Sequence, residues 1–179
     1  MTASTSERLT LAGDGSDVRL ARLAAAAIVL ALIDAGIPTP LPGVKPGLAN
    51  IVTLLAFYQL GWRAAAWVSL LRIVGAGLLL GSLLTPGFFL SLAGGVASLV
   101  ALAIARPWPR RCFGPVSASL LAAFGHIAGQ LLVARLWLIP SDGVYYFVPA
   151  FALAALATGV ANGAIAAKLM EPSWTNRIP

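Results

Sequence analysis

The sequence predicts an all-α fold, a polytopic bundle of six transmembrane helices with both termini in the cytoplasm. Three observations predict it. Hydrophobic residues make up 59% of the 179 residues and charged residues only 10%, with a mean hydropathy of +0.90. A soluble domain is usually near one-quarter charged, so lipid is the expected solvent. The apolar residues fall into six runs, and most basic residues lie between these runs on one side.

The first three predicted spans cover residues 20–37, 47–60 and 62–84. The first has Arg22 near one end and Asp34 near the other. The second is short, because a bilayer needs about 20 apolar residues per helix. The third is interrupted by Arg72, about ten residues from its start and so near the middle of the membrane.

The last three predicted spans cover residues 86–105, 113–139 and 145–170. Thr85 followed by Pro86 is typical of a capped helix start. In the fifth span, Gly125 and Gly129 form a GxxxG pattern, which lets helix backbones approach closely, and we expect packing within the chain. The spans make one membrane domain, residues 19–170, between a flexible tail at 1–18 and a second tail at 171–179.

Orientation follows from the positive charges. With the N-terminus in the cytoplasm, nine basic residues lie inside and Lys45 alone lies outside, which is a strong positive-inside bias. The inside set is Arg8, Arg19, Arg22, Arg63, Arg106, Arg110, Arg111, Lys168 and Arg177. We therefore predict a multi-pass protein of the bacterial cytoplasmic (inner) membrane, with membrane lipid as its surroundings.

Polar side chains within the predicted spans are candidate site residues, because each needs a partner or a cavity in hydrocarbon. Arg72 bonds either to backbone carbonyls or to an anion from outside. His126 is either a packing histidine or a ligand contact, and Gln130 shares its helix face four residues later. Arg135 is expected to reach outward to the interface, and Asn162 to bond across helices.

The loop Pro38–Pro46 leads into the second span with four prolines and Lys45. A helix start beside a lysine favours negative charge, and Asn50 lies one turn deeper. Two interpretations stay open: an outer mouth for an anionic or carbonyl-bearing ligand, or a tight loop whose lysine contacts lipid headgroups. Asp34 and Asp142 are placed at the outer surface, which leaves no carboxylate in the membrane core.

Several function classes lack the residues that they need. The sequence has no Asp-rich pair for magnesium diphosphate chemistry, no Walker A pattern and no HExxH motif, and Cys112 is its single cysteine. We expect no catalytic residue, no metal and no cofactor. A nucleic-acid partner is not expected either, because the basic residues flank apolar runs and do not form a solvated stripe.

Four segments, "PGVKPGLANIVTLLAFYQLGWRAA", "LLRIVGAGLLLGSL", "GFFLSLAGGVASL" and "GHIAGQLLVA", resemble the Gx transporter family, also called heptaprenyl diphosphate synthase component I. The resemblance runs from about Leu20 to Lys168. It implies a protein similar to the substrate-binding S components of energy-coupling-factor transporters, which bind a vitamin-like solute and depend on a separate energising module. The positions within its motifs that we assign to substrate binding are Lys45, Asn50, Arg72, His126 and Gln130.

Two functions follow as expectations. The first is a substrate-binding transporter subunit, not an enzyme, for a small anionic or vitamin- or cofactor-like solute. The alternative is a non-catalytic accessory subunit of a polyprenyl diphosphate or quinone-related assembly, or of a flavin-linked electron-transfer assembly. The two differ in whether Arg72 faces a water-accessible cavity.

Overall fold

The structure is a computed structural model that describes residues 15–38, 46–108, 113–139 and 141–174, with side chains described as far as Glu171. This part of the chain contains helices and the turns that join them, and no strand. Its six α-helices are α1 (Gly15–Gly36), α2 (Ala49–Gln59), α3 (Trp62–Leu79), α4 (Pro86–Ala105), α5 (Pro115–Val133) and α6 (Val148–Trp174). A π-helical turn, Ala134–Leu138, extends α5, and a 3-10 turn, Asp142–Phe147, precedes α6.

Four helical segments are long and apolar enough to cross a membrane. They are Trp62–Leu79, Pro86–Ala105, Pro115–Leu138 and Asp142–Glu171. Their outer faces carry exposed large apolar side chains, such as Leu79 at 68% and Ile104 at 67% exposed, which suit lipid and not water. These features are those of a multi-pass membrane protein. The remaining two helices differ, because α2 has only 11 residues and α1 carries four charged residues.

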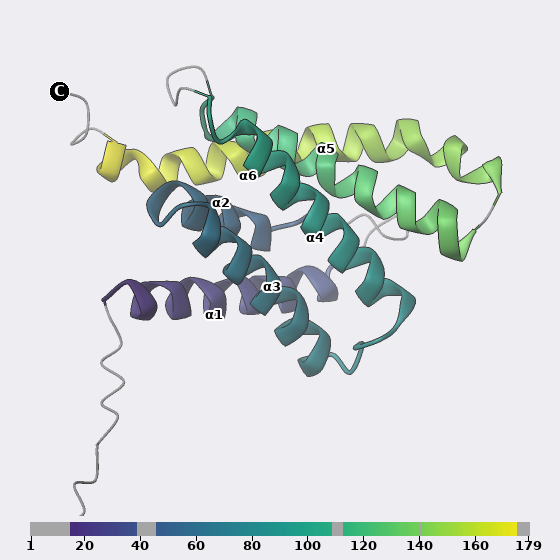
Figure 1. Ribbon diagram of the computed structural model, residues 1–179, viewed down its shortest axis with the longest axis horizontal. Helices are drawn as coiled ribbons and strands as arrows, with labels where there is room; N and C mark the ends of the chain where they lie inside the picture. Colours follow the sequence, from purple (N-terminus) through teal and green to yellow (C-terminus); the bar gives the residue numbers. More distant parts are fainter. Residues whose placement is uncertain (1–14, 39–45, 109–112, 140, 175–179) are drawn as a thin grey trace, which may run out of the picture.

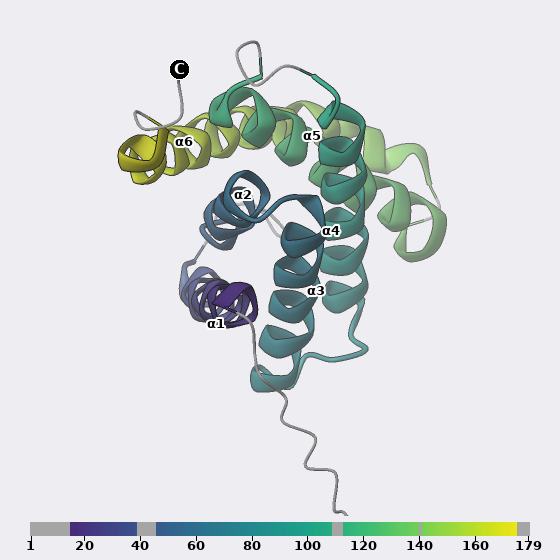
Figure 2. The same ribbon diagram turned by 60° about the vertical axis from the view of Figure 1, so that its left-hand side comes forward.

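The helices are arranged around the short helix α2. Helices α3 and α4 form a hairpin and lie side by side in both views, as do α5 and α6 (Figures 1 and 2). The packing continues from α4 onto α5, while α1 packs against α3. Helix α2 contacts α1, α3 and α6, and most of its residues are buried. A helix enclosed in this way need not match the thickness of the bilayer by itself.

Two apolar clusters hold the bundle together. One joins α2, α4, α5 and α6 through residues such as Leu54, Leu102 and Met170, all of which are at most 2% exposed. The other joins α1, α2 and α3 through Ala27, Val52 and Val68. Because α2 belongs to both clusters, it fixes the first three helices against the last three.

Most predicted helix limits agree with the structure, and the differences lie at the ends. The fourth span was predicted at 86–105 and is found there, with the Thr85 hydroxyl accepting a hydrogen bond from the Phe88 N–H at 3.3 Å. Helix α1 begins at Gly15, inside the stretch expected to be a tail. The third span ends at Leu79 and not at 84, because residues 80–85 turn back through Gly81 and Leu84, both with positive φ.

The GxxxG pattern serves packing within the chain, as expected. A Cβ placed on Gly129 would lie 2.6 Å from the carbonyl oxygen of Ala93, and one on Gly125 would lie 3.0 Å from that of Ala97. Helix α5 therefore lies almost directly on the backbone of α4. At the same contact the Ser98 hydroxyl of α4 donates to the Ala122 carbonyl of α5 at 2.7 Å.

Gly129→Ala should destabilise the fold by about 1–3 kcal/mol, because the added methyl group overlaps the Ala93 backbone, which cannot move aside locally. Gly36→Ala is the matched control, since a Cβ there meets nothing within 4 Å. Thermal unfolding of both variants in the same detergent measures the difference. Equal unfolding temperatures for the two variants would contradict the close contact of α4 and α5.

Candidate functional site

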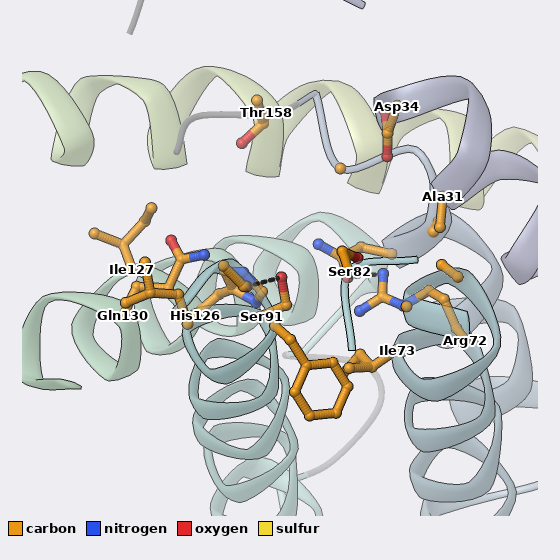
Figure 3. Close-up of a pocket in the computed structure, with 18 of the residues that line it drawn as sticks. Ala31, Asp34, Arg72, Ile73, Ser82, Ser91, His126, Ile127, Gln130 and Thr158 are labelled. Carbon is orange, nitrogen blue, oxygen red and sulfur yellow. Dashed lines mark hydrogen bonds between the residues drawn. The ribbon is translucent and has the colours of Figure 1, made fainter. Parts of the chain in front are cut away.

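A cavity of about 540 Å³ opens among all six helices. Its wall takes residues from the end of α1, the start of α2, the second half of α3, the turn after α3, the start of α4, the second half of α5 and the first half of α6 (Figure 3). A volume of this size falls in the range of small-molecule sites, roughly 300–1,000 Å³. The lining combines apolar side chains with a set of polar ones.

The guanidinium of Arg72 is the polar group of this wall whose burial costs most. It lies in α3, is 8% exposed, and its Nη1 donates a hydrogen bond to Oδ1 of Asn50 at 2.9 Å. Asn50 stands in the first turn of α2. The bond therefore connects two helices and gives the guanidinium a fixed direction at the cavity wall.

The expectation that no carboxylate lies near Arg72 was wrong. Asp34, near the end of α1, is 5% exposed and lines the same cavity as Arg72 (Figure 3). The sequence places Asp34 near a span end, which led to the outer-surface assignment. It shares a helix face with Ala24, Ala27 and Ala31, spaced by three and four residues, and this face packs into the bundle.

His126 and Gln130 line the cavity from α5, one turn apart. The imidazole of His126 packs on the backbone of Gly94 in α4, where a Cβ would lie 2.6 Å from the ring. Only glycine admits the ring at that position. Across the view from Asp34 and Arg72, these two side chains and Ile127 form the other side of the cavity (Figure 3).

Four of the five residues that we expected to bind substrate therefore lie around one cavity, although they come from three helices: Asn50, Arg72, His126 and Gln130. The fifth, Lys45, lies outside the described residues. Their role in binding stays a prediction. The polar lining residues that sequence reasoning did not assign to the site are Asp34 and the hydroxyl-bearing Ser82, Thr85, Ser91 and Thr158. Single hydroxyl groups in apolar segments gave no signal for a site.

The start of α2 is held by α6. The Asn162 amide donates hydrogen bonds to the carbonyl oxygens of Pro46 and Gly47, at 3.1 and 3.2 Å. Asn162 was expected to bond across helices, and the bonds instead reach the segment that leads into α2. This contact positions the rim of the cavity next to Asn50.

Arg135 lies apart from the cavity. It stands in the π-helical turn and forms an ion pair with Asp142 at 3.1 Å, with the two side chains 34% and 85% exposed. Arg135 was expected to reach outward, and its ion-pair partner lies in the turn before α6. An exposed pair of this kind contributes at most about 1 kcal/mol.

A second cavity of about 30 Å³ lies beside the first, and Asn50 and Thr158 line both. Its other polar lining residues are Thr53, Ser69, Ser98, Ser119 and Asn162. The volume and the hydroxyl and amide lining suit a single water molecule. Among the described residues, no group of three or more His, Cys, Asp or Glu side chains is placed to hold a metal ion.

Asp34→Asn should destabilise the fold by about 1–2 kcal/mol, because it removes a negative charge from the cavity wall that it shares with the buried Arg72 guanidinium. The double variant Asp34→Asn/Arg72→Gln should lose less stability than the sum of the losses in the two single variants, since it removes both charges. A double-mutant cycle from thermal or denaturant unfolding measures this coupling. Strictly additive losses would show that the two charges do not interact.

A family model described as heptaprenyl diphosphate synthase component I matches residues 23–169, which is most of the chain and includes the described cavity-lining residues. No curated protein and no solved structure matches the chain. The extent of the match decides the assignment. The chain belongs to the heptaprenyl diphosphate synthase component I family.

Proposed function

We propose that this chain is the substrate-binding subunit of a membrane transporter, similar to the S components of energy-coupling-factor transporters. It crosses the bacterial inner membrane six times, keeps both termini in the cytoplasm, and takes up a small anionic or vitamin- or cofactor-like solute from the outer side. It has no catalytic activity of its own. A separate energising module supplies the work of transport.

The observation that carries this proposal is the cavity and its lining. Arg72 was the residue that separated the two expected functions, because a binding subunit needs it at a water-accessible cavity. Arg72 lines a cavity of about 540 Å³ together with Asn50 and His126. A guanidinium, an amide and an imidazole around one space favour recognition of a polar solute.

The orientation predicted from the basic residues supports access from outside. With the N-terminus inside, the end of α1, the start of α2, the end of α3 and the start of α4 all belong to the outer half of the membrane, and each lines the cavity. The turn that carries Ser82 and Thr85 belongs to the same side. The solute would therefore enter beside this turn.

The inner half of the bundle supports dependence on a partner. It is filled by the apolar cluster that includes Tyr58, Leu102, Phe113 and Met170. The Tyr58 hydroxyl also donates to the Phe113 carbonyl at 3.1 Å, which ties the end of α2 to the start of α5. A solute in the cavity would meet this packed core, so its release inward requires a rearrangement driven from elsewhere.

The family description favours a second candidate function. A "component" of heptaprenyl diphosphate synthase is by name part of an assembly with other subunits. On this alternative the chain is a non-catalytic membrane accessory subunit of a polyprenyl diphosphate or quinone-related assembly, or of a flavin-linked electron-transfer assembly. Its membrane helices would then place a partner at the bilayer.

Native mass spectrometry of the gently extracted protein tests the first function. We expect the wild-type chain to retain a small polar molecule and Arg72→Ala to retain at least about tenfold less, because a charged hydrogen bond at the site is lost. Arg135→Ala is the matched control, since Arg135 is absent from the cavity wall. A wild-type chain that carries only lipid, together with a co-purifying protein, would favour the accessory subunit.

Thiol labelling in intact cells tests the topology. Cys112 is the single cysteine and falls between α4 and α5 in the sequence, in a segment that the proposal places inside. A membrane-impermeant maleimide should label it only after the cells are permeabilised. Ser141→Cys in a Cys112→Ser background should be labelled at once, because Ser141 is exposed in the turn before α6. The reverse pattern would invert the orientation.

A further inference from the structure

The cavity wall carries two side chains of opposite charge. Asp34 comes from α1 and Arg72 from α3, and both are nearly buried, at 5% and 8% exposed. Both lie on the same side of the view in Figure 3, opposite His126 and Gln130. The fixed charges of these two residues sum to zero. The wall is therefore not simply basic, as the sequence had indicated.

This balance disfavours a solute with negative charge alone. An anion that approaches the Arg72 guanidinium also approaches the Asp34 carboxylate, and the repulsion offsets part of the attraction. A solute with positive charge alone is attracted by Asp34 and repelled by Arg72. A solute that carries both signs can satisfy each wall charge with its own opposite.

The guanidinium retains donors for such a solute. Arginine has five N–H donors, and the hydrogen bond from Nη1 to Asn50 orients the group from one side. The carboxylate of Asp34 can accept hydrogen bonds from a protonated amine or a similar basic nitrogen. The two groups thus recognise two different chemical functions.

The rest of the cavity suits an uncharged body. Ser91 and Thr158 add hydroxyl groups, Gln130 adds an amide, and Phe88 and Ile127 add apolar surface. The Ser91 and Thr158 hydroxyls donate to backbone carbonyls within their own helices, at 2.9 and 2.8 Å, which leaves them to accept hydrogen bonds from a solute.

We propose that the solute of this site is zwitterionic: it carries an acidic group that pairs with Arg72 and a basic nitrogen that pairs with Asp34. This inference rests on the proposed binding function and narrows its solute class. Of the solutes proposed above, it selects a vitamin- or cofactor-like molecule that bears both charges over one that is only anionic. The uncharged part of the molecule lies toward His126 and Gln130.

The probe for the test is the water-soluble extract of the bacterial cells, divided by ion exchange into four fractions. One fraction is retained both by a cation exchanger at acidic pH and by an anion exchanger at alkaline pH, so its molecules carry both groups. The other fractions are retained by one exchanger only or by neither. Each fraction is added to the purified chain in detergent, and the unfolding temperature is measured.

We expect the doubly retained fraction alone to raise the unfolding temperature, and native mass spectrometry to identify the bound molecule in it. A rise with the fraction retained only by the anion exchanger would overturn the zwitterion while keeping the binding function. A rise with the neutral fraction would also overturn it and would make Asp34 and Arg72 an internal pair. No rise with any fraction, and no molecule retained by the wild type, would defeat the binding function itself.

Variants separate recognition from folding. Asp34→Asn should weaken binding of the active fraction by about tenfold or more. The double variant Asp34→Asn/Arg72→Gln keeps the wall neutral, and it should fold but show no temperature rise. Asp142→Asn is the matched control, because this carboxylate is exposed and pairs with Arg135 away from the cavity. Undiminished binding by the folded double variant would overturn the proposal.

Discussion

The burial of one guanidinium determines how this bundle is assembled around its cavity. Arg72 cannot lie in a lipid-embedded core without a counter-charge and hydrogen-bond acceptors. Asn50 on α2 accepts a hydrogen bond from Arg72 at 2.9 Å, and Asp34 on α1 lines the same cavity with the opposite charge. Polar groups from three helices are thus brought to one cavity, and α2 begins beside it.

The family description and the chemistry of the chain point to different aspects of one protein. The description names a synthase component, and the cavity offers a wall with balanced charge and a few hydroxyl and amide groups. Among the described residues, the charged groups of this wall are the Asp34 carboxylate and the Arg72 guanidinium. The family description by name indicates a part of an assembly with other subunits.

The sequence predicted the helices of the fold better than it predicted which charged side chains line the cavity. Apolar runs and glycine or proline punctuation locate a helix directly, which is why the fourth span and its Thr85 cap were predicted correctly. Asn50, Arg72, His126 and Gln130 could be singled out because polar groups are costly in lipid. Asp34 was assigned to the outer surface but is buried. Its burial depends on how α1 packs against the other helices, and position in the sequence does not reveal that packing.

The contact between Asn162 and the carbonyls of Pro46 and Gly47 couples the middle of α6 to the start of α2. Helix α6 is continuous over 27 residues, so at 1.5 Å per residue it is about 40 Å long and extends well beyond this contact on both sides. A partner that tilts the far end of α6 would thus shift the cavity rim without touching it, and a filled cavity would in turn resist that tilt.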